Sequence, residues 1–243
     1  MNIKGNTVLI TGGATGIGFA LAEVFIKAGN TVIVCGRREV KLKAAQAGLP
    51  GLRTIVCDVT KKKDREILYR WVRDNFPALN ILINNAGVQK MINLQEGPRE
   101  LLEGDDEIAT NFEAPIHLAA RFMPLLLKQK EAAVINVSSG LGYVPIAAMP
   151  VYCATKAGIH LFTVSLRYQL KDTPVKVFEV IPPRVNTELG GGDEEGIPPA
   201  EVAVAVIKAL ADDEYNVMVG EAQGLVESAR TNFEHAFLDI NQW

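Results

Sequence analysis

A tyrosine stands four residues before a lysine in the stretch Pro150 to Gly158, which reads PVYCATKAG. On a helix, residues four positions apart lie on the same face, about 6 Å apart. A lysine cation near a phenol favours the phenolate, so Lys156 is expected to lower the pKa of Tyr152 from about 10 and suit it to general acid–base catalysis. The same pair is common on ordinary, partly buried helices, so alone it does not establish a reactive site.

Other polar residues follow apolar runs elsewhere in the chain. Ser138 and Ser139 come at the end of AVINVS, and Asn84-Asn85-Ala86-Gly87 comes at the end of NILIN. In a parallel sheet the carboxyl ends of the strands meet at one edge, where ligands bind. The mostly apolar segment 140–151 then leads to Tyr152, and we expect it to line a substrate pocket.

The elements that must position these residues follow from the periodicity of the chain. Continuously apolar runs predict strands at 7–10, 31–35, 53–57, 80–84, 133–138, 175–181 and 216–220. Helical spacing between them predicts helices at 16–28, 39–47, 61–75, 106–130, 151–170 and 199–211. Strands that alternate with helices form a parallel sheet, so the sequence predicts an α/β, doubly wound fold (a Rossmann fold) with about seven strands and helices on both faces.

The sequence contains no linker or repeat that would divide it. We expect a single catalytic domain over residues 1–243, with a cofactor half at about 1–90 and a catalytic and substrate half at about 91–243. Only Leu189 to Pro199, LGGGDEEGIPP, reads as a long loop, and loops of this length are often functional lids.

The composition favours a soluble protein that binds neither metal nor nucleic acid. Hydrophobic residues make up 48% of the chain and the net charge is −3, which argues against a nucleic-acid surface. The three cysteines have no metal spacing and indicate reduced thiols, which together with the absence of a signal peptide or membrane span predicts a cytoplasmic protein. His117, His160 and His235 likewise show no metal spacing, so we expect no metal site.

The first predicted strand leads into a glycine-rich turn, Thr11 to Gly18, which reads TGGATGIG. Glycines allow the backbone to turn tightly and approach a ligand, and the amides at the start of the next helix can bind a pyrophosphate. Such a turn can also be a plain strand-to-helix connection. Its place at the first strand–helix junction of an alternating chain favours a dinucleotide site.

The second predicted strand is followed by Gly36, Arg37 and Arg38. An acidic residue here would bind a ribose 2′-hydroxyl, whereas arginines suit a 2′-phosphate, so we expect NADP(H) rather than NAD(H). The alternative is a solvated helix start. Asp58, after the third strand, would either accept a hydrogen bond from the adenine amino group or cap the following helix.

In order and spacing these features closely resemble the short-chain dehydrogenase/reductase family, in its form of about 250 residues, and within it the DltE-like oxidoreductases. The matching residues are TGGATGIG at 11–18, Asp58, NNAG at 84–87, Asn111, Ser139, Tyr152 and Lys156. VCGRRE, NNAGVQK and PVYCATKAG carry the likeness to the DltE-like group. The match is strong from Thr11 to Lys156, follows only the general layout after that, and is weak over the last part of the chain.

The resemblance implies a role for each matching residue. Tyr152 would protonate a carbonyl oxygen as hydride arrives, or act as the base in the reverse direction, and Ser139 would hold that oxygen. Lys156 would lower the pKa of Tyr152 and bind the nicotinamide ribose, and Asn111 would anchor a water that links Lys156 to a proton relay. The implied cofactor-binding residues are Thr11, Gly12, Thr15, Gly16, Ile17, Gly18, Arg37, Arg38, Asp58, Val59, Asn85, Ala86, Gly87, Tyr152, Lys156, Pro182, Val185 and Thr187.

One departure from the family pattern follows the sixth predicted strand. The family usually has Pro-Gly there, but this chain has Pro182-Pro183-Arg184. Pro183 removes an amide donor and fixes φ near −65°. Arg184 is either an exposed loop cation or a group that holds an anionic substrate or phosphate, and we favour the exposed cation.

The sequence therefore favours an NADP(H)-dependent oxidoreductase that acts on a small-molecule carbonyl or secondary alcohol. The alternative is a dinucleotide-binding redox sensor or scaffold protein without turnover. The resemblance also implies a homodimer or homotetramer, formed through the helices predicted at 106–130 and 151–170. The substrate and the direction of reaction do not follow from the sequence.

Overall fold

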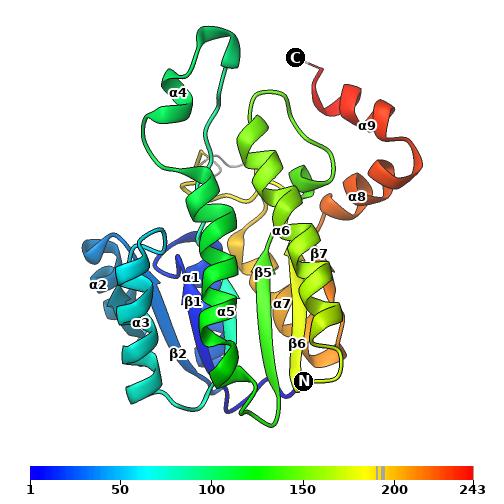
Figure 1. Cartoon of the computed structure of the whole chain (residues 1–243). Helices are drawn as coiled ribbons and strands as arrows, with labels where there is room; N and C mark the ends of the chain where they lie inside the picture. Colours follow the sequence, from blue (N-terminus) through cyan, green and yellow to red (C-terminus); the bar gives the residue numbers. More distant parts are fainter. Residues whose placement is uncertain (190, 193–194, 243) are drawn as a thin grey trace.

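The computed structural model contains one sheet of seven parallel strands (Figure 1) and describes residues 1–189, 191–192 and 195–242. The strands are β1 (Thr7–Thr11), β2 (Thr31–Gly36), β3 (Arg53–Val56), β4 (Leu79–Asn84), β5 (Ala132–Val137), β6 (Val175–Ile181) and β7 (Asn216–Met218). Their spatial order is β3-β2-β1-β4-β5-β6-β7, so the direction of winding reverses between β1 and β4. This reversal is the point at which doubly wound sheets bind ligands.

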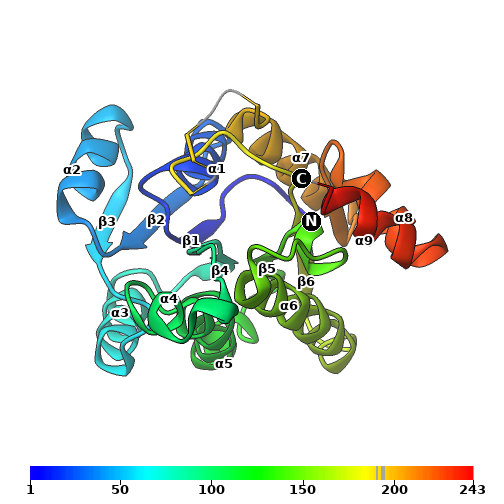
Figure 2. The same cartoon turned by 90° about the horizontal axis from the view of Figure 1, so that it is seen from above.

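Helices cover both faces of the sheet, as Figure 2 shows from above. Successive residues of a strand point to opposite faces, so Val8 and Ile10 contact one core and Leu9 the other. The first core includes α1 (Gly16–Lys27), α2 (Glu39–Gly48) and α7 (Pro199–Asp212). The second includes α3 (Lys62–Asn75), α5 (Ala114–Leu126) and α6 (Pro150–Gln169). Both faces are buried, which confirms the predicted doubly wound α/β fold and explains why the strands are apolar throughout.

Two additions lie above the carboxyl ends of the strands in Figure 1. One is an arm after β4 that contains η1 (Leu94–Glu96) and the short helix α4 (Arg99–Leu102). The other is a pair of helices near the C-terminus, α8 (Ala222–Thr231) and α9 (Phe233–Ile240). None of these elements was predicted from the sequence.

The predicted helix at 106–130 differs most from the structure. It begins with a π-helical turn, η2 (Ala109–Glu113), and α5 ends at Leu126. The amides of Lys128 and Gln129 bond carbonyls only three residues back, which closes the last turn. Other predicted boundaries lie within one or two residues of those observed.

The predicted loop at 189–199 includes Gly190, Asp193 and Glu194, which lie outside the described residues. In its described part, Ile197 forms a parallel bridge with Val185. All three cysteines are buried free thiols. Over the residues that the structure describes, no helix combines the length and the apolar character needed to cross a bilayer.

Candidate active site

Tyr152 and Lys156 lie in the first two turns of α6, which begins at Pro150. A proline in the first turn suits a helix start, because its missing N–H would have no partner there. Both side chains are buried, at 7% and 4% exposed. Lys156 Nζ lies 5.5 Å from the centre of the Tyr152 ring and donates a hydrogen bond to the carbonyl of Val137, at 2.9 Å. The last residue of β5 thus fixes the direction of the lysine.

Burial dominates the acid–base properties of this pair. It raises the pKa of Tyr152 to about 12, with interaction with the Ser139 hydroxyl acting in the opposite direction. Burial also lowers the pKa of Lys156 to about 8, because a buried ammonium loses its hydration. The sequence led us to expect a Tyr152 pKa below its usual value. In this structure removal from water dominates and raises the pKa instead, so Tyr152 holds its proton at neutral pH.

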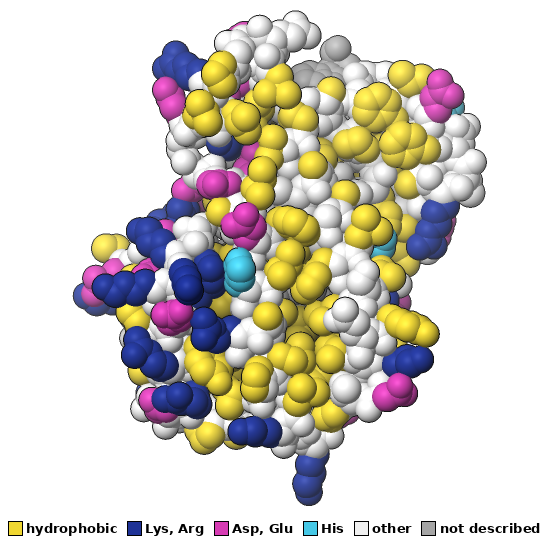
Figure 3. All heavy atoms as spheres, viewed as in Figure 1, with side chains coloured by type: hydrophobic (Ala, Val, Ile, Leu, Met, Phe, Trp, Pro, Cys, Tyr) yellow, Lys and Arg dark blue, Asp and Glu magenta, His cyan; other side chains and the backbone are white. Residues whose placement is uncertain are grey.

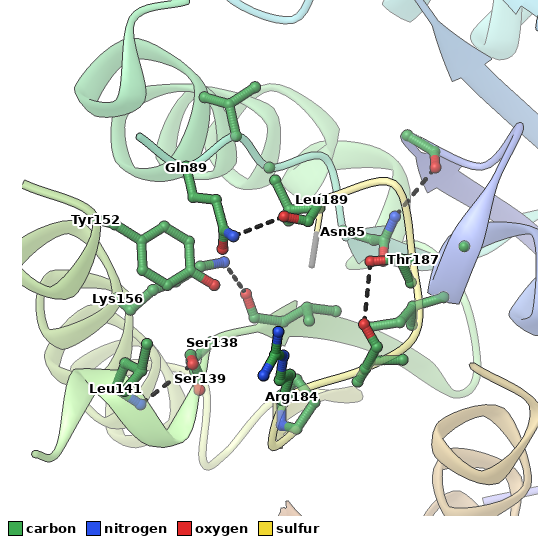
Figure 4. A pocket seen from close by; sticks show the side chains of 18 of the residues that line it. Asn85, Gln89, Ser138, Ser139, Leu141, Tyr152, Lys156, Arg184, Thr187 and Leu189 are labelled. Atoms are coloured by element: carbon green, nitrogen blue, oxygen red, sulfur yellow. Dashed lines mark hydrogen bonds between the residues drawn. The ribbon is translucent and has the colours of Figure 1, made fainter. Parts of the chain in front are cut away.

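Ser139 begins the short turn η3 (Gly140–Gly142) between β5 and α6. Its Oγ accepts a hydrogen bond from the amide of Leu141 at 3.1 Å. Gly142 presses this turn against α6, since a Cβ there would lie 2.8 Å from the carbonyl carbon of Lys156. Figure 4 shows Ser139, Tyr152 and Lys156 on one side of the pocket, with Asn85 and Thr187 on the other.

Asn111 lies in the π-helical turn η2 and is 2% exposed. Its Oδ1 accepts from the amide of Val88 at 2.9 Å, and its Nδ2 donates to the carbonyl of Val88 at 2.8 Å and to Thr155 Oγ1 at 3.2 Å. Single π-helical turns within α-helices often mark functional sites. Here the turn lets one side chain join the segment after β4 to α6.

The glycines of the turn after β1 are required by close packing. Gly12 has φ +63°, and a Cβ there would lie 2.9 Å from Ala86 Cα. Gly16 has φ +54°, and its Cβ would lie 2.9 Å from Thr187 Cγ2. A Cβ on Gly18 would lie 2.5 Å from the carbonyl oxygen of Gly12. Gly12, Gly16 and Gly18 together form the glycine cradle. This cradle has room for a ligand only because these residues have no side chains.

The start of α1 is suited to an anion. Thr15 precedes the helix without a side-chain cap, and the first turn contains no acidic residue. The amides there and the helix dipole can therefore act on a phosphate. Asn85 supports the turn through its Nδ2, which donates to the carbonyls of Thr11 and Gly12 at 2.9 and 3.2 Å. The donor set and the glycine cradle fit a dinucleotide cofactor.

Asp58, which follows β3, does not cap α3. Its Oδ1 accepts from the amide and the hydroxyl of Thr60 at 3.0 and 2.7 Å, whereas the residue before α3 is Lys61. The capping alternative is therefore wrong. Asp58 lines the same cavity as Arg37 and Arg38, which leaves the adenine interpretation in place.

The two arginines after β2 face acidic residues. Arg37 forms a bidentate ion pair with Asp105, with Nη2 2.8 Å from Oδ2. Arg38 lies 2.7 Å from Glu188, whose other oxygen lies 2.6 Å from Lys41. Arg37 and Arg38 lie between β2 and α2, and Lys41 lies in α2. Their partners come from the arm before η2 and the loop after β6.

A cavity of about 1590 Å³ joins these groups. Of the predicted site residues, all line it except Thr11, Gly18 and Asn111, which support its wall from behind. Gln89 Nε2 spans it by donating to the carbonyl of Leu189 at 2.6 Å. Around the end that holds Tyr152 the lining is largely apolar and includes Met91, Leu141, Ile146, Met149, Leu189, Leu225 and Ile240.

Sequence reasoning missed several of these lining residues. Leu225 and Ile240 lie on α8 and α9, where no motif marks a site. Met91 lies in the segment after NNAG, whose place beside the fourth strand was the only available signal. Asp105 and Glu188 gave no signal either, because their role depends on charged partners far away in the sequence.

The departure from the family pattern lies at the cavity wall. The carbonyl of Pro182 accepts from the amide of Gly140 at 3.2 Å, which ties the end of β6 to the serine turn. Pro183 and Arg184 both line the cavity. Arg184 Nη1 lies 2.6 Å from a carboxylate oxygen of Glu195, and its guanidinium is about half exposed. Arg184 is thus an exposed cation, as favoured from the sequence, and a role in holding an anion stays a prediction.

The sheet, the glycine cradle and the buried Tyr152–Lys156 pair define an oxidoreductase of the Rossmann type. The model of the family described as short chain dehydrogenase matches residues 6–197, and the chain belongs to this family. The resemblance predicted from the motifs is thereby confirmed.

Relatives support the same assignment. An uncharacterized oxidoreductase of Bacillus subtilis, DltE, is 43% identical over 99% of this chain and 98% of its own length. An uncharacterized oxidoreductase of Staphylococcus epidermidis is 32% identical over 86% of this chain and 92% of its own. The chain is therefore similar to oxidoreductases along almost its whole length.

Two crystal structures of family members have the same fold. A short chain dehydrogenase from Burkholderia cenocepacia in complex with NADP has a TM-score of 0.83 at 25% identity, covering 99% of both chains. A short chain dehydrogenase/reductase from Burkholderia phymatum in complex with NAD has a TM-score of 0.84 at 20% identity, covering 98% of this chain and 96% of its own. Proteins of this fold thus bind either nicotinamide dinucleotide.

Proposed function

We propose that this protein transfers a hydride between NADP(H) and a carbonyl or secondary alcohol, with Tyr152 as general acid and base. The observation that carries the proposal is the position of Tyr152, Lys156 and Ser139 at one side of a cavity that begins at the glycine cradle. We treat residues 1–243 as one catalytic domain, with the cofactor half at about 1–90 and the catalytic half at about 91–243.

The nicotinamide group, when bound, supplies or takes up the hydride. The protein provides the proton and the orientation. Tyr152, with a pKa of about 12, remains protonated near neutral pH and donates its proton to the substrate oxygen. Ser139 Oγ accepts from the amide of Leu141 and also interacts with Tyr152, so its hydrogen can turn to a substrate oxygen that lies beside Tyr152. In this protonation state the site is prepared to protonate a carbonyl oxygen as it is reduced.

Lys156 binds the cofactor beside Tyr152. One of its three hydrogens bonds the carbonyl of Val137, and the other two remain for the nicotinamide ribose. Asn111 anchors a water that links Lys156 to a proton relay. Both hydrogens of its side-chain amide are engaged by Val88 and Thr155, so we assign the water to its main-chain carbonyl.

The preference for NADP(H) rests on Arg37 and Arg38, which line the cavity beside Asp58. Related structures contain NAD or NADP, so the fold does not decide between them. Thr187, which contacts the cradle at Gly16, lies where it would contact the cofactor. The apolar lining around Tyr152 suits a small-molecule substrate with apolar groups on its carbonyl carbon.

We also propose a homodimer or homotetramer built on α5 and α6. Figure 3 shows that hydrophobic side chains gather on the face that these helices form. Exposed apolar residues of α6 include Leu161, Val164 and Tyr168. A patch of this kind often marks an interface. The cytoplasmic location remains a prediction from the sequence, supported by the free thiols.

The decisive experiment is Tyr152→Phe, assayed on a broad panel of carbonyls and alcohols with NADPH and NADH. We expect turnover to fall at least about a hundredfold, the low end of what proton transfer contributes, with cofactor binding nearly unchanged. Tyr215→Phe, at a residue outside the cavity and outside the face formed by α5 and α6, is the control and should behave as wild type. Activity like wild type in Tyr152→Phe would refute the mechanism. Tight cofactor binding by the wild type without turnover of any substrate would instead favour a redox sensor or scaffold protein.

A further inference from the structure

Glu179 is a charged residue buried within the sheet, one strand in from its edge. It lies on β6, between β5 and β7, and is 0% exposed. Its partners are two hydroxyls and an imidazole: Oε1 lies 2.6 Å from Ser138 Oγ, Oε2 lies 2.9 Å from His160 Nδ1, and the Tyr143 hydroxyl lies 3.4 Å from each oxygen. The mechanism above uses none of these four residues.

The direction of these hydrogen bonds follows from the donors present. A carboxylate only accepts, so the Ser138 hydroxyl donates and His160 Nδ1 carries a hydrogen toward Oε2. Tyr143 then donates to the carboxylate, while its oxygen lies 2.8 Å from the same Nδ1. Burial and the charge of Glu179 both raise the pKa of Tyr143, which keeps its hydroxyl a donor. The carboxylate therefore holds three donors at once.

These donors belong to the elements that carry the catalytic groups. Ser138 and Tyr143 lie on either side of Ser139 and its turn η3, so Glu179 holds that segment at both ends. His160 lies on α6, one turn beyond Lys156 and two turns beyond Tyr152. Gly142 contacts the backbone of α6 at Lys156 within the same segment. One side chain of β6 thus connects the serine turn to the helix of Tyr152 and Lys156.

Packing alone does not require a carboxylate at this place. Burying a charge costs free energy unless it is fully hydrogen-bonded, and apolar residues of similar size are often at least as stable. Val180 and Ile181, the next residues of β6, are apolar and equally buried. The acidic residue thus adds directional hydrogen bonds that an apolar neighbour cannot supply.

We propose that Glu179 is a positioning residue that sets the distance between the Ser139 hydroxyl and Tyr152 by holding Ser138, Tyr143 and His160 together. This inference rests on the proposed function for its catalytic consequence. The hydrogen bonds of Glu179 to Ser138, Tyr143 and His160 are called the clamp below. The clamp does not depend on turnover, because it consists of hydrogen bonds that order residues 138–144.

The test compares Glu179→Leu with Glu179→Gln. Leucine fills the space but accepts no hydrogen bond. Glutamine keeps an acceptor for Ser138, and its amide can donate to His160 in the other tautomer. We expect Glu179→Leu to lower kcat at least about tenfold, with the Kd for NADPH unchanged, because small displacements of catalytic groups are costly. Glutamine should restore kcat to within about threefold of wild type.

Amide hydrogen exchange supplies a readout that needs no substrate. In Glu179→Leu we expect faster exchange over residues 138–144 and unchanged exchange over the glycine cradle at 11–18. Glu131→Gln is the matched control, because this carboxylate bonds Lys176 near the opposite end of the strands. It should leave kcat and both exchange rates unchanged.

The outcomes distinguish the clamp from the proposed oxidoreductase function. Wild-type kcat and exchange in Glu179→Leu would overturn the clamp, and so would an equal loss of kcat in the leucine and glutamine variants. Should the leucine variant fail to fold, Ser138→Ala removes one donor and must lower kcat without changing the Kd for NADPH, or the clamp is refuted. A wild type without turnover would refute the proposed function, while the exchange experiment would still decide the clamp.

Discussion

Arg37 and Asp105 lie edge to edge, with Nη2 of the guanidinium 2.8 Å from Oδ2 of the carboxylate. Arg37 lines the cavity, and Asp105 belongs to the arm between β4 and η2. The proposed site for a 2′-phosphate therefore already contains an anion. A phosphate that binds Arg37 must compete with this carboxylate, and its binding is then coupled to the position of the arm.

Removing the competing carboxylate should strengthen NADPH binding. Both partners are nearly half exposed, so the pair contributes at most about 1 kcal/mol. Asp105→Asn is expected to lower the Kd for NADPH up to about fivefold and to leave that for NADH unchanged, as measured by fluorescence titration. Glu103→Gln, an exposed acid on the same arm that faces Arg99, is the control. Equal tightening for both cofactors would contradict the competition.

Reversing the charge of Arg37 should have the opposite effect. Arg37→Asp places a carboxylate beside Asp105 and Asp58, and we expect the Kd for NADPH to rise at least about tenfold while that for NADH changes by less than about threefold. Arg70→Asp, an exposed site on α3, controls for the change in net charge. A loss of equal size for both cofactors would show that Arg37 does not bind a 2′-phosphate.

Much of the fold could be predicted because the central strands, such as β1 and β5, are buried on both faces. Runs such as 175–181 are apolar apart from Lys176 and Glu179, and the observed β6 has the same bounds. The glycine cradle was also recognisable, because Gly12, Gly16 and Gly18 stand in a local pattern. Local sequence therefore contained the elements and the glycine-rich turn after β1.

The remaining features depend on contacts between distant segments. Asp105 and Glu188 acquire their role only when the arm and the loop after β6 reach the cations at the start of α2 and just before it. The pKa of Tyr152 also depended on tertiary structure. Spacing placed Lys156 beside the ring, but the depth of burial that raises the pKa comes from packing around α6. The helices α8 and α9 gave no strong signal, because they cover the cavity rather than form part of the sheet core.

Gly12 provides a test of the glycine cradle with an internal control. Gly12 and Gly5 both have left-handed φ, at +63° and +72°, but a Cβ on Gly5 meets nothing within 4 Å. Gly5→Ala is expected to lose about 1 kcal/mol of unfolding free energy and to bind NADPH normally. Gly12→Ala adds the contact with Ala86 and should weaken NADPH binding at least about tenfold. Normal binding by Gly12→Ala would contradict the assignment of the cradle.

The buried Lys156 should destabilise the protein at neutral pH. Its pKa is about 8 in the folded chain and 10.5 as the ordinary value. Below pH 8 both states carry the proton, so the full cost of the buried charge is present. Between pH 8 and 10.5 only the unfolded state remains protonated, so the contribution of Lys156 to stability improves as pH rises. A nontitrating side chain of similar shape avoids this cost.

Lys156→Met is therefore expected to be inactive yet more stable than wild type at pH 7. The shift corresponds to about 3 kcal/mol, and loss of the bond to Val137 reduces the gain to about 2 kcal/mol. Urea denaturation at pH 7 and pH 9.5 should show the gain shrinking at the higher pH, because wild-type Lys156 is by then neutral in the folded state. Lys208→Met, at an exposed position of α7, should change stability by less than about 0.5 kcal/mol at both pH values. A gain that is absent at pH 7, or that grows with pH, would show that Lys156 does not lose its hydration as its burial implies.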